Sequence, residues 1–87
     1  MIERLDRALK IAINKYIDSY LYEFDNKQDS DLSDEQYNFV RTLINEIMML
    51  YWIKYGDDVK VTFDSGSINI KYPTGDKRTW DKNNRWN

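Results

Sequence analysis

The chain has 87 residues and a formal net charge of −2, with no cysteine and no histidine. This length corresponds to one domain with a modest core. The missing cysteines exclude disulfides and thiolate chemistry, and the missing histidines remove the usual neutral-pH acid–base group and the commonest metal ligand. The longest apolar run is seven residues, far short of a membrane span. We therefore expect a soluble, cytoplasmic protein that folds as a single domain over residues 1–87.

The first half of the chain predicts two helices. Apolar residues recur at steps of three and four from Ile2 to Phe24 with no Gly or Pro, which predicts a helix over residues 2–24. Residues 25–33 are polar and acidic and predict a connecting loop. A second helix is predicted over residues 34–55, because Ser33 and Gln36 form a capping box and Gly56 is a suitable C-cap. A loop of this length predicts that the two helices are antiparallel.

The second half of the chain predicts a hairpin. Apolar and polar residues alternate over residues 59–72 on both sides of a Ser65-Gly66 loop, which would pair Phe63 with Ile68 and Val61 with Ile70. The remaining residues, 73–87, form a tail rich in basic and aromatic side chains, in which residues 77–80 can add a short third strand. The sequence thus predicts an α+β fold, with two antiparallel helices followed by a β-hairpin packed on helix 2.

The second helix carries more apolar residues than can lie on the face toward the first helix, because Ile47 to Ile53 are apolar or aromatic without a break. Met49, Trp52 and Ile53 point away from the stripe that faces the first helix. One explanation is that the hairpin covers them, which would make the second helix the central element. The alternative is a homodimer that forms through these three residues. The sequence leaves both a monomer and a homodimer open.

No pattern in the chain predicts catalysis or a cofactor. Serine nucleophiles need a base, and neither histidine nor an S-x-x-K motif is present. The three glycines stand singly and make no phosphate-binding loop. The acidic loop does not match a calcium-binding loop, because Asp34 stands at the position of the invariant glycine and Val40 at that of the bidentate glutamate. We expect no enzyme activity, no cofactor and no metal site.

The acidic residues concentrate in one region. Residues 18–35 contain seven carboxylates and one lysine, a net charge of −6. One interpretation is a solvated loop that aids solubility, and the other is a surface that docks on a basic partner protein. The candidate docking residues are Glu23, Asp25, Asp29, Asp31, Asp34 and Glu35.

The tail offers a second candidate surface. Basic residues alternate there with two tryptophans, a combination that is typical of sites where nucleic-acid bases stack on aromatic rings. For Trp80 itself, closing the edge of the hydrophobic core is the favoured interpretation. Because the pI is about 5.0, nucleic acid is not expected to be a partner. The candidate residues of this surface are Lys77, Arg78, Trp80, Lys82, Arg85 and Trp86.

In size, in an amino-acid composition that fits an A/T-rich genome, in its lack of catalytic groups and in its asymmetric acidic charge, the chain resembles small phage-encoded inhibitors, including anti-CRISPR proteins. No motif carries this resemblance, so no residue role follows from it. The resemblance implies a non-enzymatic protein that binds a host protein. The alternatives are a nucleic-acid-binding accessory protein that uses the hairpin and the tail, and a homodimeric structural or assembly subunit.

Overall fold

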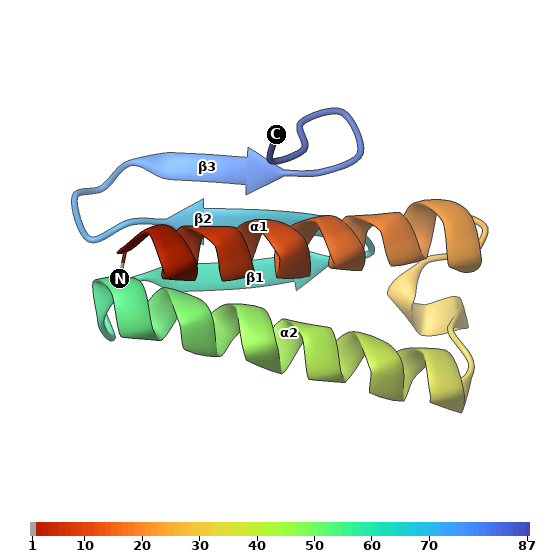
Figure 1. Cartoon of the computed structure of the whole chain (residues 1–87). Helices are drawn as coiled ribbons and strands as arrows, with labels where there is room; N and C mark the ends of the chain where they lie inside the picture. Colours follow the sequence, from red (N-terminus) through yellow and green to blue (C-terminus); the bar gives the residue numbers. More distant parts are fainter. Residues whose placement is uncertain (1) are drawn as a thin grey trace.

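The structure is a computed structural model that describes the backbone of residues 2–87 and the side chains from Arg4 onward. Figure 1 shows two antiparallel helices packed against a three-stranded antiparallel sheet, which confirms the predicted α+β class. The elements in chain order are α1 (Ile2–Asp18), the π-helical turn η1 (Ser19–Glu23), the 3-10 turn η2 (Asp29–Asp31), α2 (Asp34–Tyr55), β1 (Lys60–Asp64), β2 (Ser67–Lys71) and β3 (Lys77–Trp80).

The ends of α2 follow the predicted local signals. The side chain of Ser33 accepts a hydrogen bond from the Gln36 N–H at 3.2 Å, and the Gln36 side chain accepts one from the Ser33 N–H at 2.9 Å. This reciprocal pair satisfies two N–H groups that a helix start leaves free. At the other end Gly56 has a φ of 79°, and its N–H donates to the Trp52 carbonyl at 2.7 Å. The predicted bounds of α2 are therefore confirmed.

The first helix ends in a wider turn. After Asp18 the chain continues as η1, and the Phe24 N–H donates to the Ser19 carbonyl, five residues earlier, at 2.9 Å. The next two residues, Asp25 and Asn26, have φ values of 52° and 59°. Asp and Asn tolerate this left-handed conformation better than other non-glycine residues do. The helical segment thus spans nearly the predicted range of 2–24, and residues 25 and 26 turn the chain into the loop.

The sheet has the predicted register and the predicted third strand. Phe63 pairs with Ile68 and Val61 pairs with Ile70, across a two-residue loop. Ser65 and Gly66 both have positive φ values, 44° and 93°, as a type I′ hairpin turn requires. The strand order is β1-β2-β3, so β2 is central and β1 and β3 are the two edges.

The core lies between the sheet and both helices, and the first helical segment contributes the largest share of it. Of the fifteen buried apolar residues in the described part of the chain, seven lie between Leu9 and Phe24 and four lie in α2. The sheet contacts α1 through the rings of Tyr16 and Phe63, whose centroids are 5.4 Å apart. It contacts α2 through the ring pair of Tyr55 and Tyr72, at 5.1 Å. The predicted packing of the hairpin on α2 is therefore confirmed, but the sheet packs on the first helix as well, so α2 is not the single central element.

The outer side of α2 is not covered by the hairpin. Met49, Trp52 and Ile53 are 60%, 47% and 62% exposed. The sheet instead packs across the face that both helices share, because the longer apolar stripe of the first helix offers more area to bury there. The inference that these three residues need the hairpin as cover is corrected, since exposed apolar residues are common on folded proteins.

Candidate functional site

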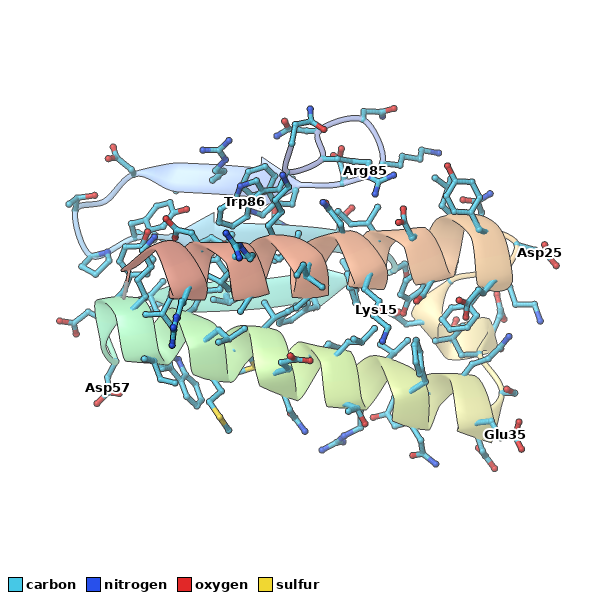
Figure 2. All side chains as sticks on the ribbon, viewed as in Figure 1. Lys15, Asp25, Glu35, Asp57, Arg85 and Trp86 are labelled. Atoms are coloured by element: carbon cyan, nitrogen blue, oxygen red, sulfur yellow. The ribbon has the colours of Figure 1, made fainter. Side chains whose placement is uncertain are left out.

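The acidic residues gather at the end of the molecule where the two helices are joined. Figure 2 shows Asp25 and Glu35 at this end, far from Asp57 at the opposite end of α2. We call the acidic end the exposed carboxylates of Glu23, Asp25, Asp31, Asp34 and Glu35. The two ion pairs found within 4.0 Å in the described part of the chain, Lys54 with Asp6 and Arg85 with Asp18, do not involve any of them. Among the described side chains, none of these five carboxylates is therefore paired with a cation.

Asp29, the sixth predicted docking residue, has a different role. Its carboxylate accepts hydrogen bonds from the Tyr20 hydroxyl and, at 3.0 Å, from the Ser65 N–H. In return, the Asp29 N–H donates to the Ser65 side-chain oxygen at 2.9 Å. Asp29 thus ties the acidic loop to the β1–β2 turn. Sequence reasoning assigned it to the surface, because a contact between residues 36 positions apart leaves no local pattern.

The turn that Asp29 holds is itself set into the core. The Gly66 N–H donates to the buried Tyr16 hydroxyl at 3.1 Å. A Cβ atom at Gly66 would lie 3.0 Å from the Tyr20 Cβ, so only glycine fits this position without a shift. Burial raises the pKa of Tyr16 to about 12 and also raises the pKa of Tyr20, because the ionised phenolates would lose their hydration. Both hydroxyls therefore stay protonated and are structural.

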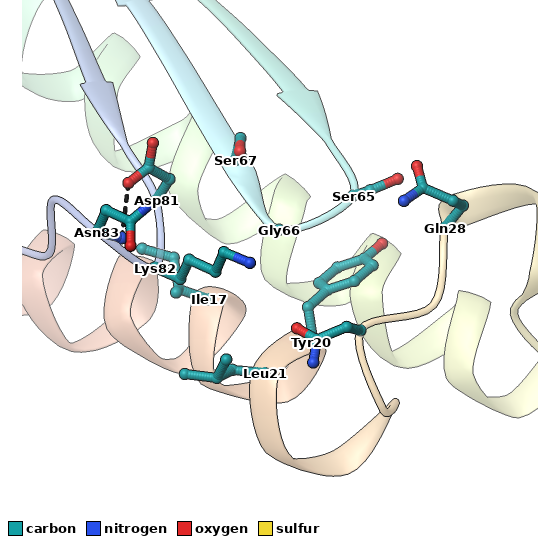
Figure 3. A pocket seen from close by; sticks show the side chains of 11 residues that line it. Ile17, Tyr20, Leu21, Gln28, Ser65, Gly66, Ser67, Asp81, Lys82 and Asn83 are labelled. Carbon is teal, nitrogen blue, oxygen red and sulfur yellow. Dashed lines mark hydrogen bonds between the residues drawn. The ribbon is translucent and has the colours of Figure 1, made fainter.

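A small polar hollow lies beside this turn. Figure 3 shows its lining, which comes from the end of the helical segment, the acidic loop, the β1–β2 turn and the tail. The hollow has a volume of about 200 Å³. Its side chains include Gln28, Lys82 and Asp81, whose carboxylate accepts a hydrogen bond from the Asn83 N–H at 2.8 Å. A hollow of this size and polarity can hold one polar side chain of a partner or one small polar molecule.

The two tryptophans of the tail are engaged within the molecule. Trp80 is buried, and its indole N–H donates to the Tyr51 hydroxyl at 3.3 Å. The ring of Trp86 stacks on that of Trp80 with centroids 5.0 Å apart, and the Trp86 carbonyl accepts from Asn14 at 2.8 Å. The expectation that Trp80 closes the core is confirmed. As part of the core, Trp80 has no ring face on which a nucleic-acid base could stack.

The basic residues of the tail divide into two groups. Arg85 forms an ion pair with Asp18 at 2.9 Å, which ties the tail to the end of α1 (Figure 2). The Arg78 guanidinium lies over the Trp80 ring, 4.0 Å from its centroid. Lys77 and Lys82 are exposed. The structure therefore brings the six predicted tail residues to one edge of the sheet, but Arg85 and Trp86 hold the tail on α1, and Trp80 belongs to the core.

Among residues 2–87 no three His, Cys, Asp or Glu side chains are grouped so that they could hold a metal ion. None of the helices described in the structure is both long and apolar enough to cross a membrane. Comparison with protein families, with curated protein sequences and with solved structures gives no match.

Proposed function

We propose that this protein is not an enzyme and acts by binding another protein, with the acidic end docked on a basic surface of that partner. The observation that carries the proposal is that contacts within the chain hold the acidic loop in place, while no ion pair of the described residues involves the acidic end. The Asp29–Ser65 contact and the Ser33–Gln36 capping box fasten the loop. A surface that is ordered before binding loses less conformational entropy when the partner docks.

The proposal includes the class of protein. An asymmetric acidic surface on a small domain is what a phage-encoded inhibitor of the anti-CRISPR type would need to occupy the nucleic-acid-binding face of a host protein. The partner would then be a basic protein in the bacterial cytoplasm. Two features support this class of protein: the negative charge of the acidic end and the contacts that hold the acidic loop in place.

The test is a charge-neutralising variant with a matched control. Glu23→Gln, Asp25→Asn and Asp31→Asn together remove three charges of the acidic end without touching Asp29. The control, Glu46→Gln, Asp57→Asn and Asp58→Asn, removes the same charge elsewhere. The partner is first captured from a host lysate and identified, and its association rate is then measured at two salt concentrations.

Electrostatic steering accelerates association by 10-fold or more at low salt. We expect the acidic-end variant to associate about tenfold more slowly than wild type at low salt, with a smaller difference at high salt. The control should associate as the wild type does. Equal rates for both variants would show that the acidic end is not the docking surface.

A second candidate function has one specific observation in its favour. Lys60, Lys71 and Lys77 are cross-strand neighbours, so three positive charges form one row across the outer face of the sheet. Like charges placed opposite each other destabilise a sheet, which suggests that an anion such as a nucleic-acid backbone uses them. The row lines a shallow hollow of about 410 Å³.

Two features weaken this nucleic-acid alternative. Trp80 and Trp86 are stacked on each other and so do not form an open stacking platform. The loops next to the lysine row contain Asp57, Asp58 and Asp76, which reduce the local positive charge. The protein-binding function therefore remains the favoured proposal.

A further inference from the structure

The two edges of the sheet are not alike, and β1 has the open one. In the hairpin the Asp64 carbonyl and the Ser67 N–H close the turn, so Asp64 and Ser67 form a hydrogen-bonded pair. Such pairs alternate along antiparallel strands. The N–H and C=O groups of Val61 and Phe63 must therefore point away from β2. Among the hydrogen bonds that residues 2–87 form outside the strand ladders and helices, none uses these four groups.

The β3 edge is covered in part, at Thr79. The Tyr72 N–H donates to the Asp76 carbonyl at 2.8 Å, so the same alternation directs the backbone groups of Thr79 outward. The side chain of Asn84, from the tail, donates a hydrogen bond to the Thr79 carbonyl. Natural sheets commonly protect an exposed edge in this way. At β1 no such cover is present within the described chain.

An apolar wall runs beside the open edge. Figure 1 shows α2 alongside β1, outside the three strands. One flank of α2 presents apolar side chains at steps of seven, four, four and three residues, which places them on one side of a helix. Two of them, Tyr37 and Trp52, are 47% exposed. The full set is Tyr37, Ile44, Met48, Trp52 and Tyr55.

A hollow separates this wall from the edge strand. Its volume is about 270 Å³, and Leu32, Tyr37, Ile44 and Phe63 contribute to its lining. Its walls therefore come from the loop, from α2 and from β1. It provides an apolar space directly beside unpaired backbone groups, which is the combination that holds an added β-strand.

We propose that the protein partner contributes an extended segment that pairs with the edge of β1 as a fourth strand. Its backbone would hydrogen-bond with Val61 and Phe63. Because side chains alternate between the faces of a strand, every second side chain would enter the space between β1 and α2 and should be apolar. At the turn end, Asp64 and the acidic end favour a basic residue in this segment.

The alternative occupant, β1 of a second copy, is disfavoured by the helices. Two-fold pairing of β1 with itself would place the helices of both copies on the same face of the joined sheet. Since α2 already lies beyond the β1 edge (Figure 1), the second copy would bring its own α2 against the helices of the first. An extended segment without a helix of its own avoids this collision.

The test uses a displayed library of random eight-residue peptides as the probe. The best binder is synthesised, and its affinity is measured for the wild type and for two proline variants. Val61→Pro removes an outward N–H at the β1 edge and leaves the pairing with β2 intact. Thr79→Pro, the matched control, removes an outward N–H at the β3 edge. Circular dichroism establishes that both variants fold.

We expect selected peptides to alternate apolar residues and to lose at least tenfold in affinity with Val61→Pro but not with Thr79→Pro. Hydrogen exchange on the wild type provides a measurement that does not depend on any variant. The amides of Val61 and Phe63 should exchange rapidly in the free protein and become protected when the peptide binds. A selection that returns no binder, or protection located elsewhere, would overturn the proposal. So would a dimer of the wild type that Val61→Pro dissociates.

This inference rests on the proposed function in assuming that the partner is a protein, but the two can fail separately. The peptide is also titrated against the variant with Glu23→Gln, Asp25→Asn and Asp31→Asn. Unchanged affinity and salt dependence, together with loss of binding in Val61→Pro, would retain the strand pairing and reject docking through the acidic end. Binding that depends on the three carboxylates and not on Val61 would reject the strand pairing alone.

Discussion

Asp29 and Ser65 exchange hydrogen bonds, since the backbone N–H of each donates to a side-chain oxygen of the other, at 2.9 and 3.0 Å. The two residues come from the acidic loop and from the β1–β2 turn. This contact fastens the turn, which has positive φ values, to the long polar loop. The contact fixes the end of the molecule at which the acidic charges are displayed.

Asp29→Ala should destabilise the protein by about 1–3 kcal/mol, because it leaves two hydrogen-bond donors without their acceptor. The control is Asp31→Ala, which removes an exposed carboxylate that accepts no hydrogen bond in the described chain and should change stability by less than about 0.5 kcal/mol. Urea unfolding followed by circular dichroism measures both. Equal stability of the two variants would contradict the structural role of Asp29.

Gly66→Ala and Gly75→Ala form a matched pair. The two glycines have nearly the same φ, 93° and 94°, so alanine meets a similar backbone cost of about 1–2 kcal/mol at each. Only at Gly66 would the added Cβ also meet Tyr20, at 3.0 Å, whereas nothing lies within 4 Å at Gly75. We therefore expect Gly66→Ala to cost about 1–3 kcal/mol more than Gly75→Ala. Similar melting temperatures would show that the turn does not press on Tyr20.

Stability should fall at alkaline pH. The pKa of Tyr16 is raised to about 12 in the folded protein by burial, so this group holds its proton where the unfolded chain, with a pKa near 10, has released it. The stability that Tyr16 contributes is complete below pH 10 and is lost as the pH rises toward 12. Unfolding free energies measured from pH 8 to pH 11.5 should decline above about pH 10. Tyr16→Phe should be less stable at neutral pH and should show a shallower decline.

Trp52 and Trp80 should respond differently to truncation. Trp80 is 3% exposed and stacks on Trp86, so Trp80→Ala should cost about 3–5 kcal/mol. Trp52 is 47% exposed, and Trp52→Ala should cost less than about 2 kcal/mol. Sedimentation of the wild type and of Trp52→Ala at high concentration also tests the proposed dimer through Met49, Trp52 and Ile53. A dimer that this variant abolishes would support that use of the surface.

The sequence predicted those features whose signals are local. The capping box needs only Ser33 and Gln36, three residues apart, and the hairpin register follows from the parity of apolar residues on either side of Ser65-Gly66. The contact of Asp29 with Ser65 joins residues 36 positions apart, and that of Asn14 with Trp86 joins residues 72 positions apart. Single polar pairs at such separations produce no periodicity, so the fixed loop and the docked tail were not predictable.

The position of the sheet was misjudged for a different reason. The apolar run from Ile47 to Ile53 indicates that α2 carries excess apolar surface, but not which element covers it. Because apolar residues are common at protein surfaces, the apolar back of α2 did not require any element to cover it. The stronger constraint was the long stripe from Leu9 to Phe24, which required a sheet to cover it.

Binding to nucleic acid should be weak despite the lysine row of the outer sheet face. The protein has a net charge of −2, and its tail tryptophans stack on each other instead of forming an open platform for bases. We expect no binding to short DNA or RNA tighter than about 10 μM at physiological salt, within the range of non-specific binders. A fluorescence titration at two salt concentrations measures this. The comparison variant carries Lys60→Gln, Lys71→Gln and Lys77→Gln and should behave as the wild type does. Submicromolar binding that this folded variant loses would favour the nucleic-acid function over the protein-binding one.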